Sequence, residues 1–136
     1  MTQEAEQVLY TEESSIQSHI RAVERGLPFY VFTGLQDELG LSKSELAELA
    51  QISTRTLNRR KERGFFSPTE SERLHRFEAL LKAAERVLAT RDDAREWLQT
   101  PVRALGGYSP LRFAKHETGA REVFDLLGRL EYGVFS

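Results

Sequence analysis

The chain has 136 residues, a formal net charge of −2 and no cysteine. The missing cysteines exclude disulfides and thiolate chemistry and favour a reducing cytoplasm, and the balanced charge is unlike that of a dedicated nucleic-acid binder. The polar, acidic N-terminus is not expected to be a signal peptide, and no apolar run approaches the about 20 residues that span a bilayer.

The N-terminal part of the chain predicts two amphipathic helices. Residues 1–11 show no apolar periodicity, whereas Ile16, Ile20 and Val23 recur at helical spacing and predict a helix over residues 12–25. Gly26 is suited to the position just past its end. A second helix is expected to begin near Pro28 and to end near Gly40. Its inward residues are Phe32, Leu35 and Leu39.

Residues 41–61 have the pattern of two short helices joined by a tight turn. Ser42 and Glu45 form a capping box that starts the first helix, and Ser53 can cap the second. Leu57 is expected to turn inward toward the apolar residues of the first helix. The turn has Gln51 where such motifs often have glycine, so a plain helical hairpin remains the alternative to a helix-turn-helix.

The second of these helices carries a cluster of cations on its outer face. In a helix-turn-helix this face enters the major groove, where Asn58 could bind adenine and Arg55 or Arg59 could bind guanine. Arg60 and its cationic neighbours are expected to contact phosphates. The candidate DNA-binding residues are Ser53, Thr54, Arg55, Asn58, Arg59, Arg60, Lys61 and Arg63.

The rest of the chain is also expected to be helical. Ser67, Pro68 and Glu70 form the strongest helix start, and this helix is expected to continue to about Ala89 with an apolar face broad enough to need cover from the core or a second subunit. Asp92 is expected to cap the next short helix. The remaining expected elements are a loop over residues 101–110, a helical turn through Phe113 and a last helix from Glu117 to about Tyr132. The expected class is all-α, because no segment alternates with the period of a strand.

No pattern in the chain predicts catalysis or metal binding. His19, His75 and His116 lie in different elements, without a second histidine or a carboxylate at ligand spacing. The serines lack an accompanying His/Asp arrangement, and Gly106-Gly107 lacks the strand and the lysine of a phosphate-binding loop. We therefore expect no enzyme activity, no metal and no cofactor.

The C-terminus is unusually apolar. The last helix has one apolar stripe that Leu126 widens, and Tyr132, Val134 and Phe135 add apolar surface after it. Such a tail either folds back on its own core or is buried in a partner. The residues taken alone leave both alternatives open.

Several separate blocks resemble the Xre/MbcA/ParS-like antitoxins, which join a Xre-type helix-turn-helix to a toxin-binding domain. The resemblance runs from about Leu39 to Ser136 and keeps the order of the blocks. The blocks are Leu57-Asn58-Arg59-Arg60-Lys61, Glu72-Arg73-Leu74, Trp97-Leu98 with Pro101, Arg103-Ala104-Leu105-Gly106-Gly107, Ser109-Pro110-Leu111, Gly119-Ala120-Arg121-Glu122-Val123 and Leu127-Gly128-Arg129-Leu130-Glu131-Tyr132-Gly133-Val134.

The resemblance implies an antitoxin that blocks the active site of a cognate RES-type toxin acting on NAD, in a complex that represses its own operon. We expect the chain to bind operator DNA as a homodimer. We expect three parts in the chain: an N-terminal tail and helix (1–26), a helix-turn-helix domain (27–66) and a helical toxin-binding domain (67–136). The alternative is a stand-alone transcriptional regulator whose C-terminal half dimerises or binds an effector. The candidate toxin-binding residues are Leu126, Arg129, Leu130, Glu131, Tyr132, Val134, Phe135 and Ser136.

Overall fold

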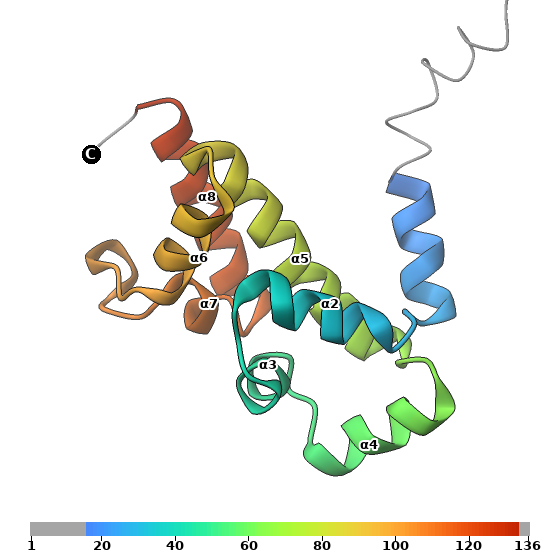
Figure 1. Ribbon diagram of the computed structural model, residues 1–136. Helices are drawn as coiled ribbons and strands as arrows, with labels where there is room; N and C mark the ends of the chain where they lie inside the picture. Colours follow the sequence, from blue (N-terminus) through green and yellow to red (C-terminus); the bar gives the residue numbers. More distant parts are fainter. Residues whose placement is uncertain (1–15, 134–136) are drawn as a thin grey trace, which may run out of the picture.

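The computed structural model describes residues 16–133, which fold into helices joined by short turns (Figure 1). Within this range there is no strand, only an isolated antiparallel bridge between Pro28 and Phe65. The all-α prediction is confirmed. The elements are a first helix (16–25), α2 (Tyr30–Leu39), α3 (Lys43–Leu49), α4 (Thr54–Arg63), α5 (Pro68–Leu88), α6 (Arg91–Gln99), a short 3-10 helix (Arg103–Leu105), α7 (Pro110–Phe113) and α8 (Glu117–Glu131).

Local capping accounts for most of these boundaries. The side chains of Ser42, Ser53 and Ser67 each accept a hydrogen bond from a backbone N–H three residues later, as predicted. The prediction for α6 was wrong by two residues. Thr90, in extended backbone conformation, accepts the N–H of Asp93 at 3.1 Å, which leaves Asp92 in the first turn of the helix.

The long helix α5 lies at the centre of the molecule. It packs against α2 on one side and against α6 and α8 on the others (Figure 1). Leu74, Phe77, Leu80 and Ala84 are fully buried in a single core that also includes residues of α3 and α4. The broad apolar face of this helix is therefore internal core, and it needs no second subunit to cover it.

A clamp at the start of α5 fixes the N-terminal helices. The Leu27 N–H donates to Ser71 Oγ at 2.8 Å, and the Phe66 N–H donates to the Leu27 carbonyl oxygen at 2.9 Å. Gly26 lies so close to the Phe66 backbone that a Cβ added to it would be 2.2 Å from the Phe66 carbonyl oxygen. These contacts hold the segment after α4 against the segment before α2, and so position the helix-turn-helix.

Candidate functional site

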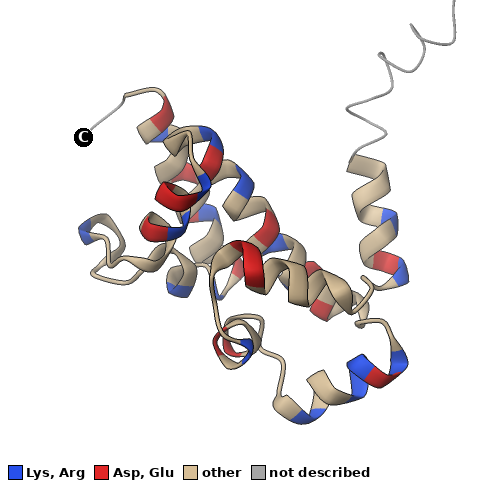
Figure 2. Cartoon of the chain, in the orientation of Figure 1, with Lys and Arg blue, Asp and Glu red and all other residues tan. Residues whose placement is uncertain are grey.

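Helices α3 and α4 form the predicted pair. Leu46 and Leu57 are buried to 0% and 1% exposure, and Ala47 is also buried, which lets the two helices approach closely. Leu57 thus faces inward as expected, and the opposite face of α4 is open to solvent. Figure 2 shows the concentration of basic residues along α4.

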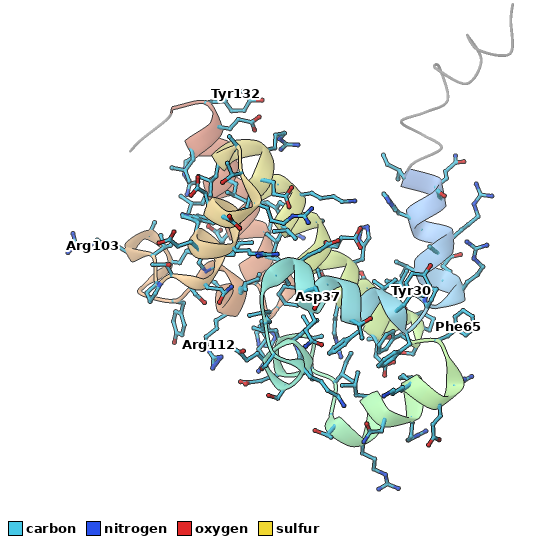
Figure 3. All side chains as sticks on the ribbon, viewed as in Figure 1. Tyr30, Asp37, Phe65, Arg103, Arg112 and Tyr132 are labelled. Carbon is cyan, nitrogen blue, oxygen red and sulfur yellow. The ribbon has the colours of Figure 1, made fainter. Side chains whose placement is uncertain are left out.

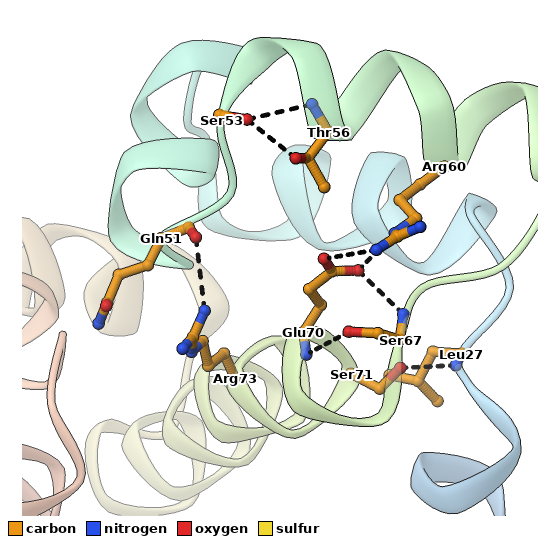
Figure 4. A network of polar contacts seen from close by, with 9 residues as sticks. All are labelled: Leu27, Gln51, Ser53, Thr56, Arg60, Ser67, Glu70, Ser71 and Arg73. Carbon is orange, nitrogen blue, oxygen red and sulfur yellow. Dashed lines mark hydrogen bonds and ion pairs between the residues drawn. The ribbon is translucent and has the colours of Figure 1, made fainter.

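The turn between the two helices has the geometry of a glycine turn although it contains Gln51. Gln51 has a φ of 57°, in the left-handed region that a non-glycine residue enters at a cost. Two tertiary hydrogen bonds hold it there. Its Nε2 donates to the Lys115 carbonyl oxygen at 3.1 Å, and its own carbonyl oxygen accepts from Arg73 Nη1 at 3.4 Å (Figure 4).

Arg60 requires a correction. It was expected to contact phosphate, but its guanidinium donates twice to the Glu70 carboxylate, with Nε–Oε1 at 2.7 Å and Nη2–Oε2 at 3.1 Å (Figure 4). The two side chains are only 14% and 12% exposed. Burial raises the pKa of Glu70, but the hydrogen bonds from Arg60 and from the Ser67 backbone outweigh it and leave this pKa below its ordinary value. Arg60 therefore joins α4 to α5.

The other predicted DNA-binding residues lie on the exposed part of α4. Ser53 differs from the rest in that its hydroxyl is engaged in capping, because it accepts the Thr56 N–H at 3.1 Å and donates to Thr56 Oγ1 at 3.0 Å. Within residues 16–133 none of the cations of this face forms an ion pair. The exposed residues of the face are Thr54, Arg55, Asn58, Arg59, Lys61 and Arg63.

In the C-terminal surface, α8 buries more of its apolar stripe than was expected. Leu126 is only 9% exposed and Leu130 packs partly against the core, so most of the Leu126 side chain is engaged in the core of this chain. Leu126 fills the core because it faces the same side of α8 as the buried Val123. Glu131 is also engaged, since it forms an ion pair with Arg86 in which Oε1 and Nε are 3.5 Å apart.

The end of α8 remains open to solvent. Tyr132 is 79% exposed and projects from the molecule (Figure 3), and Arg129 is also exposed. Phe124, on the same helix, is 36% exposed, although its spacing places it on the apolar stripe of α8. Val134, Phe135 and Ser136 lie outside the described residues.

The structure brings His19 and His75 together, which their positions in the sequence did not indicate. The two rings are 5.1 Å apart between centroids, where the first helix meets α5. Burial lowers the pKa of His75, and the neighbouring His19 lowers it further. No group of three or more potential metal ligands occurs in the described part of the chain, and no helix in that part is long and apolar enough to cross a membrane.

Comparisons with known proteins identify both halves of the chain. Residues 18–78 match the family of antitoxin Xre-like helix-turn-helix domains, and residues 83–133 match the family of antitoxin Xre/MbcA/ParS C-terminal toxin-binding domains. The boundary between the two matches falls within α5. The chain is 37% identical to an "Antitoxin Xre" of Yersinia enterocolitica over 119 residues, which cover 86% of this chain and 80% of the relative. It is 32% identical to an "Antitoxin Xre" of Photorhabdus laumondii over 126 residues, which cover 90% of this chain and 85% of that relative.

Proposed function

The chain belongs to the Xre antitoxin family, and from this premise we propose that it neutralises a cognate RES-type, NAD-degrading toxin by covering the toxin's active site and represses its own operon through α4. The observation that carries the proposal is the separation of two surfaces. The exposed cations of α4 and the exposed end of α8 lie at opposite ends of the molecule (Figure 1), so we expect DNA and toxin to be able to bind at the same time.

The DNA-binding part of the proposal rests on α4. Its exposed Arg55, Asn58 and Arg59 suit base edges in the major groove, and Lys61 and Arg63 suit phosphates. Two copies of the helix are needed to reach two half-sites of an operator, so we propose a homodimer. The exposed Ile16 and Ile20 of the first helix support this, because they would gain from cover by a second copy.

The toxin-binding part rests on the end of α8. An exposed tyrosine beside an arginine is typical of residues that dominate the energetics of protein interfaces. We propose that Tyr132, Arg129 and Leu130 enter the toxin cleft, together with the predicted tail residues Val134, Phe135 and Ser136. Glu131 contributes at the rim, where the toxin would compete with Arg86 for it.

The test compares two exposed tyrosines. Tyr132→Ala is expected to lose rescue of cells from the proposed cognate RES-type toxin, and to lose co-purification with that toxin, while DNA binding persists. Tyr30→Ala is the matched control, because Tyr30 is 72% exposed on α2, far from α8 (Figure 3). A chain that ends at Glu131 keeps the Arg86 pair and is expected to behave like Tyr132→Ala.

Two outcomes would contradict the proposal. If the truncated chain still rescues cells, the end of α8 is not the blocking element. If no RES-domain protein binds the full chain while DNA binding is strong, the protein is the stand-alone regulator that the sequence left as the alternative.

A further inference from the structure

A second group of cations lies beside the helix-turn-helix, where the end of α7 meets the start of α8. The Lys115 carbonyl oxygen accepts two hydrogen bonds, from Gln51 Nε2 and from Arg76 Nη1, each at 3.1 Å. Arg73 Nη1 donates to the Gln51 carbonyl oxygen. These contacts place Lys115 and Arg73 directly against the turn that precedes α4, and Arg76 against Lys115.

Over residues 16–133, none of Arg73, Arg76 and Lys115 forms an ion pair, although both arginines donate to backbone oxygens. The neighbouring Arg112 is exposed and points away from the body (Figure 3), and a 3.5 Å contact joins its Nη2 to Glu48 Oε1. Phosphate competes easily for such an exposed pair, which contributes little to stability.

The position of the group suggests its partner. A helix-turn-helix enters the major groove with the N-terminal residues of its second helix, while its first helix crosses the sugar-phosphate backbone. The turn between the two helices therefore lies close to the phosphates of the flanking strand. Cations attached to that turn face the same polyanion as α4, which favours DNA over an acidic peptide.

We propose that Lys115 binds a phosphate of the DNA strand that flanks the groove entered by α4, so that the C-terminal domain forms part of the DNA-binding surface. The inference rests on the proposed DNA binding by α4. Lys115 is anchored through its carbonyl oxygen, and its side chain takes no part in that anchoring. A flexible ammonium group binds phosphate as a point charge and needs no fixed geometry.

The test uses Lys115→Ala, which keeps both backbone contacts. Binding of the full chain to two duplexes, one from the region upstream of its own gene and one of random sequence, is measured over a range of salt concentrations. Lys115→Ala is expected to weaken binding to both duplexes by a similar factor and to reduce the slope of log K against log salt by about one per protomer. Lys115→Glu is expected to weaken binding further.

Lys82→Ala is the matched control, since it removes the same charge from a 67% exposed side chain of α5, paired with Glu78. Equal affinities and salt slopes for Lys115→Ala and Lys82→Ala would overturn the inference. If in that case Arg55→Ala still abolishes binding, the proposed role of α4 stands and only the role of Lys115 fails. If the unsubstituted chain binds neither duplex, both proposals fail.

Discussion

Arg60 and Glu70 join the recognition helix α4 to the central helix α5 through two parallel hydrogen bonds. The Glu70 carboxylate also accepts the Ser67 N–H at 2.9 Å and so completes the capping box of α5. One side chain thus starts a helix and fixes the angle at which the neighbouring helix meets it. The orientation of the exposed face of α4 relative to α5 therefore depends on this pair.

We expect the pair to contribute to stability, because it is largely buried and charge-assisted. A double-mutant cycle with Arg60→Ala and Glu70→Gln, measured by urea unfolding, is expected to give a coupling energy of about 1–3 kcal/mol. A coupling energy near zero would mean that the two side chains act independently. Arg91 and Glu85, an exposed pair at 3.0 Å, provide the control and are expected to couple by less than about 1 kcal/mol.

Gly119 is required by the close approach of α8 to α7. An added Cβ would lie 1.7 Å from the Phe113 carbonyl oxygen, which belongs to the backbone and cannot rotate away. We expect Gly119→Ala to lower the free energy of unfolding by about 1–3 kcal/mol or more, because α8 must shift. At Gly128, on the same helix, an added Cβ would meet no other element of the described chain within 4 Å, so Gly128→Ala is expected to stabilise by about 0.5–1 kcal/mol. Similar values for both variants would contradict this packing.

The stability of the chain is expected to fall as the pH is lowered below 6.5, the ordinary pKa of histidine. Burial and the nearby His19 and Lys82 lower the pKa of His75 in the folded state, while Glu78 and Glu72 oppose the shift. The unfolded chain therefore takes up the proton first, and acid favours unfolding.

Urea unfolding at about pH 7.5 and about pH 5.5 measures this effect. His75→Gln is expected to lose part of the pH dependence, whereas His116→Gln, at an exposed position before α8, is expected to keep it. The assignment to His75 fails if both variants respond to pH as the unsubstituted chain does.

The strained turn at Gln51 also gives a measurable expectation. Gln51→Ala keeps the strained left-handed backbone and loses the hydrogen bond to the Lys115 carbonyl oxygen. This variant is therefore destabilised both by the backbone strain and by the lost hydrogen bond. Gln51→Gly loses the same hydrogen bond but relieves the backbone. Thermal or urea unfolding is expected to show the glycine variant more stable than the alanine variant by about 1 kcal/mol. The reverse order would mean that the turn is not left-handed in solution.

Asn58 is expected to carry sequence discrimination. It is exposed on α4, so Asn58→Ala should leave stability nearly unchanged. We expect it to reduce the preference for operator over random DNA by about 1–3 kcal/mol, because a bidentate amide contact reads one base. Lys61→Ala is expected to weaken binding to both DNAs alike. If Asn58→Ala weakened binding to operator and random DNA equally, Asn58 would contact the sugar-phosphate backbone of the DNA and not a base.

The sequence by itself determined the features that depend on residues close together in the chain, such as the starts of the helices. Each of the caps Ser42, Ser53 and Ser67 acts on a backbone N–H three residues away, so its pattern is visible in the chain. The same holds for the inward Leu57 and for Gly64, which ends α4 with a φ of 96°. The prediction of Asp92 as the cap of α6 failed because Thr90 can also cap, and only the backbone conformation shows that Thr90 stands at the start of the helix.

The functional surfaces depended on contacts between distant residues, which only the tertiary structure decided. Periodicity placed Leu126 on an apolar stripe, but it could not tell how much of that stripe the core would cover. In the sequence, Arg60 is one of several cations of α4. Its ion pair with Glu70, across the turn between α4 and α5, shows that its role is structural. The contact between Gln51 and Lys115 spans 64 residues, and no local pattern encodes it. The sequence determines the chemical type of each side chain. Whether that side chain is free to contact a partner depends on which residues the folded chain packs against it.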